Sequence, residues 1–550
     1  MVYLRASNVR RVVSLLMVAG GVALLAVAAY GRDARTSVRE GGTFRIAQYQ
    51  PITNLDPALV DPDSVALQLL DATCAHLMTY PDRQPPRGYR LIPEVATGYP
   101  RVSRDGRTYT FVLSRSYRFN TKAPVRPSAF AWAITRALRL AALDRQGLTP
   151  APLLLDIVGA EEVADGRAQN VTGITVRGNR LVIRLLRRVP DFAARMTEVC
   201  AVPPGLPPDL EGRLTFAAAG PYYIAKHVRG RTIVLQRNRQ YHGPRPHHVE
   251  RIVVDEDAAS YDDVLQRVRR GLADYGWAPP AYFRDGLVKR YGVNRSQFWV
   301  KPGFDLIHYV FNSRSPLFRN NPALRRAVSF AVNRAAVRHA LVGGALRARL
   351  TDKYLPPAFP GFDNARIYPL KRPNLKRARA LAKGHRRSGR AVLYTLDRPV
   401  PIAAAQVIAR NLARIGLDVT VKPIDGVSYF PRLATNRDEP WDLAFAAWAP
   451  SYFDPHAYLN ELFDGRFIGV TNLGRFDVRK YNRMLRHAAG GRGKSRYQAY
   501  GALDVRLARD AAPSVAIQFN NVLTLVSRRV DKRCIVLRPY FDLAAVCLKP

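Results

Sequence analysis

The sequence predicts a mixed α/β protein that folds into at least two lobes. A chain of 550 residues is longer than one ordinary hydrophobic core can organise. Its hydrophobic content of 47% is typical of a globular protein. Strands and hairpins dominate the first half, whereas strands alternate with helices beyond Trp277, which indicates α/β organisation.

Glycine turns and alternating apolar residues predict the strands of the first half. Residues 41–48, GGTFRIAQ, form a strand introduced by two glycines. Residues 172–186 alternate between apolar and polar on both sides of Gly178, and residues 220–238 contain a similar turn near Gly230. Each of these two stretches therefore predicts a β-hairpin.

Apolar residues at helical spacing predict the main helices. Residues 63–78 and 126–141 show this spacing in the first half of the chain. In the second half, a strand over residues 305–312 precedes a helix over residues 321–332. The amphipathic helix over residues 401–416 ends at a glycine and leads into an alternating strand.

The segment WAPSYFDPHAYL, residues 448–459, combines aromatic residues with a helix start. Asp454 is expected to be the N-cap and Pro455 the first helical residue, because a carboxylate accepts from free amide groups and proline lacks one. Asp454 is therefore interpreted as structural. Trp448 and Tyr452 follow a predicted strand and are candidate ligand contacts.

The N-terminus has the pattern of an export signal. Three arginines precede an uncharged apolar run over residues 12–29, and residues 26–28, Ala-Val-Ala, offer a cleavage site. The run is also nearly long enough to span a bilayer uncleaved. Residues 1–31 are therefore expected to be a signal peptide or an N-terminal membrane anchor. Because the first cysteine is Cys74, the protein is not expected to be a lipoprotein.

Four cysteines are expected to form disulfides after export. Cys74, Cys200, Cys534 and Cys547 allow three pairings. Cys534 and Cys547 flank a short apolar segment and could close a local loop, which leaves Cys74 with Cys200. None has the spacing of a redox or zinc motif, so a structural role is favoured.

The formal net charge of +42 does not by itself indicate a nucleic-acid partner. The arginines are dispersed through every segment and are not gathered in one stripe or tail. Arginine-rich coding bias is the favoured explanation, with attraction to an anionic membrane surface or to acidic ligands as a by-product.

Two enzyme-like interpretations are weak. Residues 488–495, AAGGRGKS, fit a permissive nucleotide-loop pattern, but the sequence before them predicts a helix instead of the required strand. The chain has neither the GxSxG nor the HExxH motif of common hydrolases. No catalytic residue, cofactor or metal ion is expected.

The order of landmarks along the chain resembles that of the extracellular solute-binding proteins of family 5. This family is the large peptide-binding type that feeds ABC importers. The resemblance covers essentially the whole chain after the export signal, and it rests on the order and spacing of several segments. These segments are residues 41–47, 54–58, 91–120, 126–138, 218–224, 308–334 and 448–459.

The resemblance implies an α/β fold of the periplasmic-binding-protein type, with three domains in two lobes around a hinge. Domain I would be discontinuous and would combine residues 41–58, 172–277 and 498–550. Domain II would span residues 59–171, and domain III residues 278–497.

The resemblance also implies a binding function without catalysis. The protein would be a monomeric substrate-binding component of an ABC importer, located in the periplasm or at the cell surface. It would capture a small peptide or another elongated solute by hinge closure and deliver it to a permease in the cytoplasmic membrane. An exported hydrolase or a sugar-binding protein on the same fold is the alternative.

Site residues follow from the family pattern Trp-x-x-Asp-Tyr-x-Asp-Pro, whose first aspartate binds the free amine of a peptide. In this sequence Ser451 stands at that position between Trp448 and Tyr452, so the charged anchor is missing. The ligand amine is therefore expected to be absent, blocked or bound elsewhere. The other expected ligand contacts are Gln48, Gln50, Trp277, Phe519 and Asn520. The order of elements in the relatives also supports pairing Cys74 with Cys200.

Overall fold

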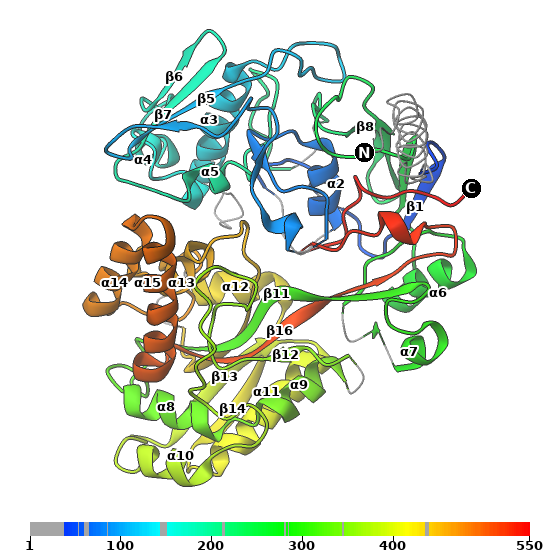
Figure 1. Cartoon of the computed structure of the whole chain (residues 1–550). Coiled ribbons are helices and arrows are strands. Elements are labelled where there is room, and N and C mark those ends of the chain that lie inside the picture. The colour runs from blue at the N-terminus through cyan, green and yellow to red at the C-terminus, as the bar shows by residue number, and fades with distance from the viewer. Residues whose placement is uncertain are drawn as a thin grey trace, which may run out of the picture.

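The computed structural model has two lobes, one above the other in Figure 1. The expected signal peptide or anchor, residues 1–31, lies outside the described residues. The structure describes residues 38–550 apart from 53, 60–64, 85, 144–150, 212–214, 280, 281, 284, 344, 345, 435–438 and 539.

A six-stranded sheet forms the centre of the lower lobe. Its strand order is β12-β16-β11-β15-β13-β14, and the pairs β13–β14 and β13–β15 are parallel whereas the remaining pairs are antiparallel. In that order the strands are Arg349–Leu350, Ser514–Leu525, Phe298–Phe311, Leu443–Trp448, Arg390–Leu396 and Asp418–Ile424.

Helices cover both faces of this sheet. One buried cluster joins the sheet to α8–α12, and another joins it to α13–α15, so the lower lobe has three layers. The helices are α8 Pro322–Ala331, α9 Arg334–Val342, α10 Leu375–Ala382, α11 Pro399–Ala413, α12 Gly426–Ala434, α13 His456–Phe463, α14 Arg479–Gly490 and α15 Gly493–Arg506. A π-helical turn, Leu507–Ala511, continues α15.

The upper lobe contains two four-stranded sheets. One has the order β1-β10-β9-β8, with strands Thr43–Ala47, Arg251–Asp255, Thr232–Arg237 and Tyr222–Val228. The other has the order β4-β5-β7-β6, with strands Arg101–Val102, Thr108–Val112, Arg180–Arg184 and Ile174–Arg177. A small pair, β2 and β3, consists of Met78–Thr79 and Ile92–Pro93.

Both predicted hairpins are present in these sheets. Gly178 joins β6 to β7 and Gly230 lies between β8 and β9, each with a positive φ that glycine adopts without strain. The remaining helices are α2 Val65–Thr73, α3 Pro127–Leu143, α4 Ala160–Ala164, α5 Phe192–Arg195, α6 Tyr261–Arg270 and α7 Asp285–Tyr291. Within the described residues, no helix is both long enough and apolar enough to cross a bilayer.

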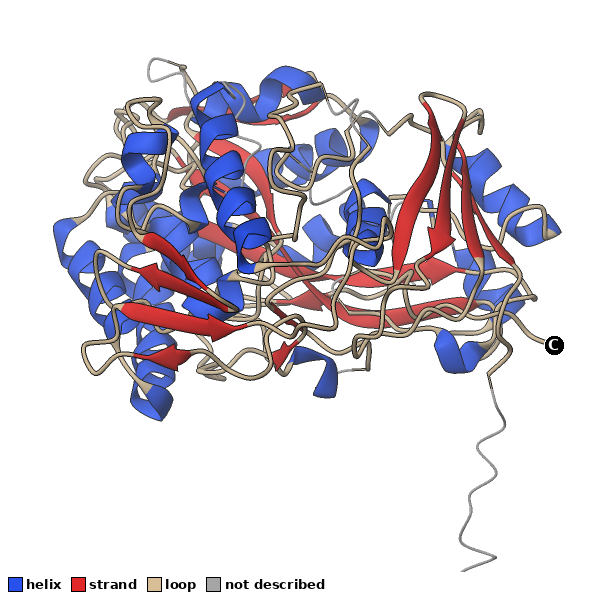
Figure 2. Cartoon of the chain, turned by 90° about the horizontal axis from the view of Figure 1, so that it is seen from above, coloured by secondary structure: helices blue, strands red, loops and turns tan. Residues whose placement is uncertain are grey.

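Segments far apart in the sequence share one core near the C-terminus. Residues from β1, β8, β9 and β10 pack with apolar residues of the C-terminal segment, residues 526–548. Figure 2 shows this sheet at the right, next to the C-terminus. This arrangement supports a discontinuous domain I, whose boundaries remain a proposal. The hairpin of β6 and β7 pairs with β5, and β16 pairs with β11.

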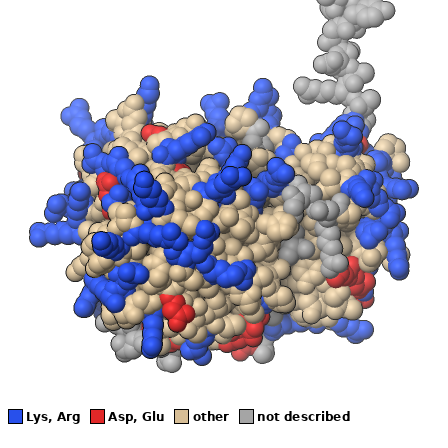
Figure 3. Space-filling view, turned by 90° about the horizontal axis from the view of Figure 1, so that it is seen from below, with Lys and Arg blue, Asp and Glu red and all other residues tan. Residues whose placement is uncertain are grey.

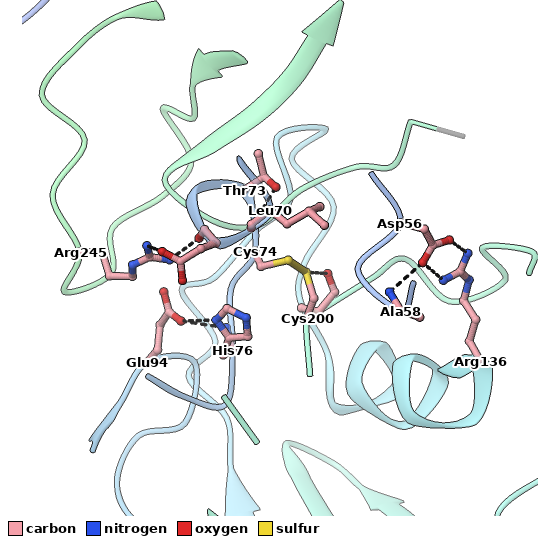
Figure 4. The surroundings of a disulfide bond; sticks show 12 residues. Asp56, Ala58, Leu70, Thr73, Cys74, His76, Glu94, Arg136, Cys200 and Arg245 are labelled. Atoms are coloured by element: carbon pink, nitrogen blue, oxygen red, sulfur yellow. Dashed lines mark hydrogen bonds and ion pairs between the residues drawn. A yellow bond between two sulfur atoms is a disulfide. The ribbon is translucent and has the colours of Figure 1, made fainter. Parts of the chain in front are cut away.

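The structure contains two disulfides, Cys74–Cys200 and Cys534–Cys547. The first joins the residue after α2 to a segment that follows α5 (Figure 4). Beside it, Asp56 is buried and accepts a hydrogen bond from Nη1 of Arg136 at 2.7 Å. The disulfide ties the end of α2 to the segment after α5, and the ion pair ties the loop before α2 to α3.

Candidate functional site

The loop after β15 lies at the seam where the two lobes meet. Helix α13 begins at His456, one residue later than the sequence predicted, because Pro455 occupies the N-cap position. Asp454 still satisfies a free amide, since its Oδ1 accepts from the backbone N of His456 at 2.9 Å. The loop therefore presents its side chains to the upper lobe from a fixed helix start.

Asp191, which precedes α5 in the upper lobe, receives hydrogen bonds from both lobes. Nε of Arg195 donates to its Oδ2 at 2.7 Å within the upper lobe. From the lower lobe, the hydroxyl of Tyr452 donates to Oδ2 at 3.0 Å, and Nη2 of Arg496 donates to Oδ1 at 3.2 Å. All four side chains are buried, so the hydrogen bonds that connect the lobes here are shielded from bulk water.

Arg496 joins this contact to the loop. Its Nη1 donates to Oδ2 of Asp454 at 2.7 Å, and its Nη2 donates to Oδ1 of Asp454 at 2.8 Å. This bidentate geometry fixes the guanidinium in one plane. The same guanidinium also reaches Asp191, so one arginine from α15 serves two buried carboxylates, one from each lobe.

The protons of this network have one consistent arrangement. Arginine only donates, so the contact of 3.3 Å between Nη2 of Arg195 and Nε2 of His456 requires Nε2 to accept. His456 is then a neutral imidazole with its proton on Nδ1. That proton points to the hydroxyl of Tyr452, 2.9 Å away, and Tyr452 in turn donates to Asp191. We refer to Asp191, Arg195, Tyr452, Asp454, His456 and Arg496 as the seam network.

Burial and charge shift the titration of these groups in opposite directions. Burial alone would raise the pKa of Asp191, but the charges of Arg195 and Arg496 hold it well below its usual range. Burial lowers the pKa of His456 far below its usual value, in agreement with a neutral ring. Burial also raises the pKa of Glu461, a buried carboxyl group of α13, well above its usual value.

A cavity of about 330 Å³ lies beside the seam network and has walls from both lobes. Aromatic rings and prolines make up much of its lining. The lining residues are Tyr80, Tyr89, Leu91, Pro190, Asp191, Ala193, Ala194, Ala358, Phe359, Pro360, Phe453, Asp454 and Tyr497. Phe453 stands among rings of both lobes, with centroids 4.6 Å from both Tyr80 and Tyr89 and 5.4 Å from Phe304.

The charged groups of this cavity are already neutralised. Asp191 and Asp454 are the charged side chains in its described lining, and both are paired with arginines. The hydroxyl of Tyr80 accepts from the backbone N of Phe453 at 3.0 Å, which adds another hydrogen bond between the lobes. Among the described residues, no group of three or more His, Cys, Asp and Glu could hold a metal ion. The cavity therefore suits binding of an uncharged group.

The three residues expected to form the ligand-binding loop have different surroundings. Trp448 is half-buried, and its Nε1 donates to the carbonyl of Ala457 at 2.7 Å. Ser451 is exposed. Tyr452 is fully buried and its hydroxyl belongs to the seam network. Their two neighbours along the chain, Phe453 and Asp454, line the cavity instead.

The remaining expected contacts lie elsewhere in the described structure. Gln48 is buried and its Nε2 donates to the carbonyl of Gln50 at 2.8 Å. Trp277 is half-buried, with its ring 5.7 Å from that of Tyr261. Phe519 and Asn520 belong to β16, where Phe519 is buried and Asn520 half-buried. None of these residues is in the described lining of the cavity.

Sequence reasoning did not select Asp191, Arg195 or Arg496 as site residues. The i,i+4 spacing of Asp191 and Arg195 indicates an ion pair on a short helix, and this was the one local signal available. Arg496 is 305 positions from Asp191, and the rings of Tyr80 and Tyr89 have no motif around them. Folding alone brings these side chains together.

Comparison with known proteins identifies relatives among exported binding proteins. A family model described as bacterial extracellular solute-binding proteins, family 5 Middle, matches residues 90–469. The chain is 25% identical over 329 residues to the probable ABC transporter periplasmic-binding protein SapA of Escherichia coli (strain K12). That match covers 58% of this chain and 57% of SapA, little more than half the length of the relative. Di/tripeptide-binding protein 1 of Pseudomonas aeruginosa (strain UCBPP-PA14) is 21% identical over 73% of this chain and 75% of its own length.

Solved structures match nearly the whole chain. Clavulanic acid biosynthesis oligopeptide binding protein 2 superposes with a TM-score of 0.82 at 24% identity, covering 94% of this chain and 96% of its own. DppA from Helicobacter pylori, solved in complex with the peptide STSA, gives a TM-score of 0.74 at 18% identity and covers 93% and 99%. These likenesses confirm the α/β fold expected from the sequence.

Proposed function

Because the chain belongs to the bacterial extracellular solute-binding proteins of family 5, we propose that it is the substrate-binding component of an ABC importer. The family consists of solute-binding proteins and not of enzymes, which argues against the exported hydrolase considered as an alternative. The names of the relatives, an ABC transporter binding protein and a di/tripeptide-binding protein, support a peptide or another elongated solute as ligand.

The observation that carries this proposal is the cavity at the seam. Tyr80 and Tyr89 contribute to it from the upper lobe, and Phe359, Phe453 and Tyr497 from the lower lobe. A ligand in this position touches both lobes at once, so its binding favours the closed arrangement over an open one. The cavity volume of about 330 Å³ is at the small end of ligand sites, which suits one part of an elongated solute.

The lining suggests what that part of the ligand is. Asp191 and Asp454 already have arginine partners, so neither is available to pair with an ammonium group. Aromatic faces favour apolar or ring-shaped groups. We therefore propose that the buried part of the ligand is uncharged. The absence of a carboxylate at Ser451 agrees with a ligand whose amine is absent, blocked or bound elsewhere, and sugars and modified peptides remain candidates.

Two long strands provide a route for hinge motion. β11 and β16 pair along most of their length, but their register shifts between Pro302 and Leu306 and again beside His308. β11 and β16 together form a two-stranded ribbon. One end of the ribbon packs with α6 and α7, and the other end lies in the core of the lower lobe. We propose that the ribbon bends near Gly303, where the ladder is interrupted.

The partner and location follow from the same proposal. The relative from Escherichia coli is named a periplasmic protein, and this chain begins with the pattern of an export signal. We propose that the protein works outside the cytoplasmic membrane as a monomer and delivers its ligand to a permease there. Whether residues 1–31 are cleaved or remain as a tether is tested by N-terminal sequencing of the exported protein.

Identification of the co-purifying ligand tests the proposed function. Mass spectrometry of the protein isolated under native conditions should find a small solute, and thermal-shift titration with N-acetylated peptides, free-amine peptides and oligosaccharides should rank the classes. Tyr497→Ala removes a ring from the cavity and should weaken binding at least tenfold. Tyr223→Ala, which removes a half-buried tyrosine outside the cavity, is the matched control. Equal affinity for both variants would show that the ligand binds elsewhere.

A further inference from the structure

A segment of the lower lobe is strongly basic and contains no acidic residue. Residues 365–396 include no Asp or Glu. All ten cationic residues of the segment are exposed, and none forms an ion pair among the described residues. They are Arg366, Lys371, Arg372, Lys376, Arg377, Arg379, Lys383, Arg386, Arg387 and Arg390.

The composition of the chain does not predict a basic segment of this length without acidic residues. The whole chain has 85 Lys and Arg against 43 Asp and Glu, or about one acidic residue for every two basic ones. Ten cations would therefore be accompanied by about five acidic residues if the charges were mixed as elsewhere. A bias toward arginine that acted evenly along the chain would not remove acidic residues from this segment, although one exposed carboxylate, Asp418 of β14, lies opposite Arg390 at its edge.

The fold gathers these cations on one outer surface. Helix α10 buries Ala378 and Ala382 and leaves its basic residues in solvent. Two hydrogen bonds extend the surface to neighbouring elements. Nε of Arg379 donates to the carbonyl of Arg414 at 3.0 Å, and Nη2 of Arg387 donates to the carbonyl of Arg319 at 2.7 Å. Arg414 and Arg319 are also exposed. We call the ten cations with Arg319 and Arg414 the α10 patch.

The α10 patch lies at the end of the lower lobe that points away from the seam. Helix α10 is at the bottom of Figure 1, on the far side of the six-stranded sheet from the upper lobe. Seen from below, this face shows many Lys and Arg side chains and few Asp and Glu (Figure 3). A partner bound here leaves the upper lobe free to move.

The chemistry of the patch favours a lipid surface over nucleic acid. The two aromatic residues of the segment, Tyr368 and Tyr394, are buried, so neither offers a ring on which a base could stack. Long flexible cations spread over an exposed helix suit a layer of anionic headgroups, where each basic residue strengthens binding roughly fivefold. We propose that the α10 patch docks the lower lobe on an anionic lipid bilayer.

Vesicle flotation of the full chain tests this proposal. The wild type is compared on vesicles of phosphatidylcholine alone and on vesicles with 30% phosphatidylglycerol, at several salt concentrations. The patch variant combines Lys371→Gln, Arg372→Gln, Lys376→Gln and Lys383→Gln, whose side chains make no hydrogen bond or ion pair among the described residues. The control variant removes the same charge from the upper lobe through Arg101→Gln, Arg104→Gln, Arg177→Gln and Arg180→Gln, all exposed.

The proposal predicts binding to the anionic vesicles that weakens as salt screens the charges. The patch variant should lose at least tenfold in affinity, whereas the control variant should lose less than twofold. Equal losses in the two variants would overturn the proposal, because net charge alone would then be responsible. Equal binding of the wild type to neutral vesicles would also overturn it, as would tighter binding of a single-stranded oligonucleotide to the patch at the same salt concentration.

Discussion

Replacement of Tyr452 by phenylalanine should weaken ligand binding by disturbing the closed arrangement of the lobes. The hydroxyl of Tyr452 donates to Oδ2 of Asp191 across the seam at 3.0 Å and accepts from Nδ1 of His456, 2.9 Å away. Tyr452 is 0% exposed, so water has no access to replace the lost hydroxyl in the closed form. In an open form, water would solvate the same groups. The substitution should therefore destabilise the closed form and leave the free energy of the open form almost unchanged.

The size of the effect follows from the charge of the acceptor. A hydrogen bond to a charged group contributes about 1.5–3 kcal/mol. Asp191 keeps its bonds to Arg195 and Arg496, so a loss near the middle of this range, about 2 kcal/mol, is expected. This corresponds to a decrease of about 30-fold in the ratio of closed to open protein, and in ligand affinity to the same extent.

Tyr500→Phe provides the matched control. Its hydroxyl is also buried and donates to Oδ1 of Asn460 at 2.7 Å, but both residues belong to the lower lobe. This bond is present whether the lobes are open or closed, so its loss should lower the free energy of unfolding and leave affinity unchanged. Isothermal titration with the co-purified ligand measures affinity, and small-angle X-ray scattering measures closure. If Tyr452→Phe and Tyr500→Phe changed affinity equally, the seam network would have no role in closure.

Three further predictions concern charge, pH and covalent links. Ser451→Asp should favour free-amine over N-acetylated peptides by no more than about fivefold, because an exposed ion pair contributes at most about 1 kcal/mol, and an unchanged preference would contradict the family-based role of Ser451. Burial raises the pKa of Asp504 to about 7. Between about pH 4 and pH 7 this carboxyl group is therefore protonated in the folded protein but ionised in the unfolded chain. Stability should therefore fall as pH rises through this window, by on the order of 4 kcal/mol, and urea unfolding should show a smaller fall for Asp504→Asn. Removal of the Cys74–Cys200 bridge, which spans 126 residues, should cost about 5 kcal/mol against about 3 kcal/mol for the C-terminal bridge, which spans 13. This ranking depends on the pairing of the cysteines, so peptide mapping under non-reducing conditions that found another pairing would contradict it.

Local patterns predicted those parts of the fold that local physics determines. The hairpins at Gly178 and Gly230 follow from alternating strands on either side of a glycine with positive φ, and both are present. The start of α13 was placed one residue too early because aspartate and proline are each suited to more than one position at a helix N-terminus. Domain boundaries are less accessible to such reasoning, since a strand such as β16 pairs with partners that are distant in sequence.

The seam network could not be predicted because it is made of pairs that no sequence pattern joins. Tyr452 is an aromatic residue in a candidate ligand loop, and sequence alone does not distinguish a ring that faces a ligand from one that contacts the opposite lobe. The two roles are distinguished by Asp191, which lies 261 positions away and accepts a hydrogen bond from the Tyr452 hydroxyl. Arg496 extends the same argument, because it pairs with Asp454 in its own lobe and also donates to Asp191, which lies 305 positions away in the other lobe. Closing the lobes therefore joins two ion pairs that each lobe already contains, Arg496–Asp454 in the lower lobe and Arg195–Asp191 in the upper lobe, through the hydrogen bond from Arg496 to Asp191.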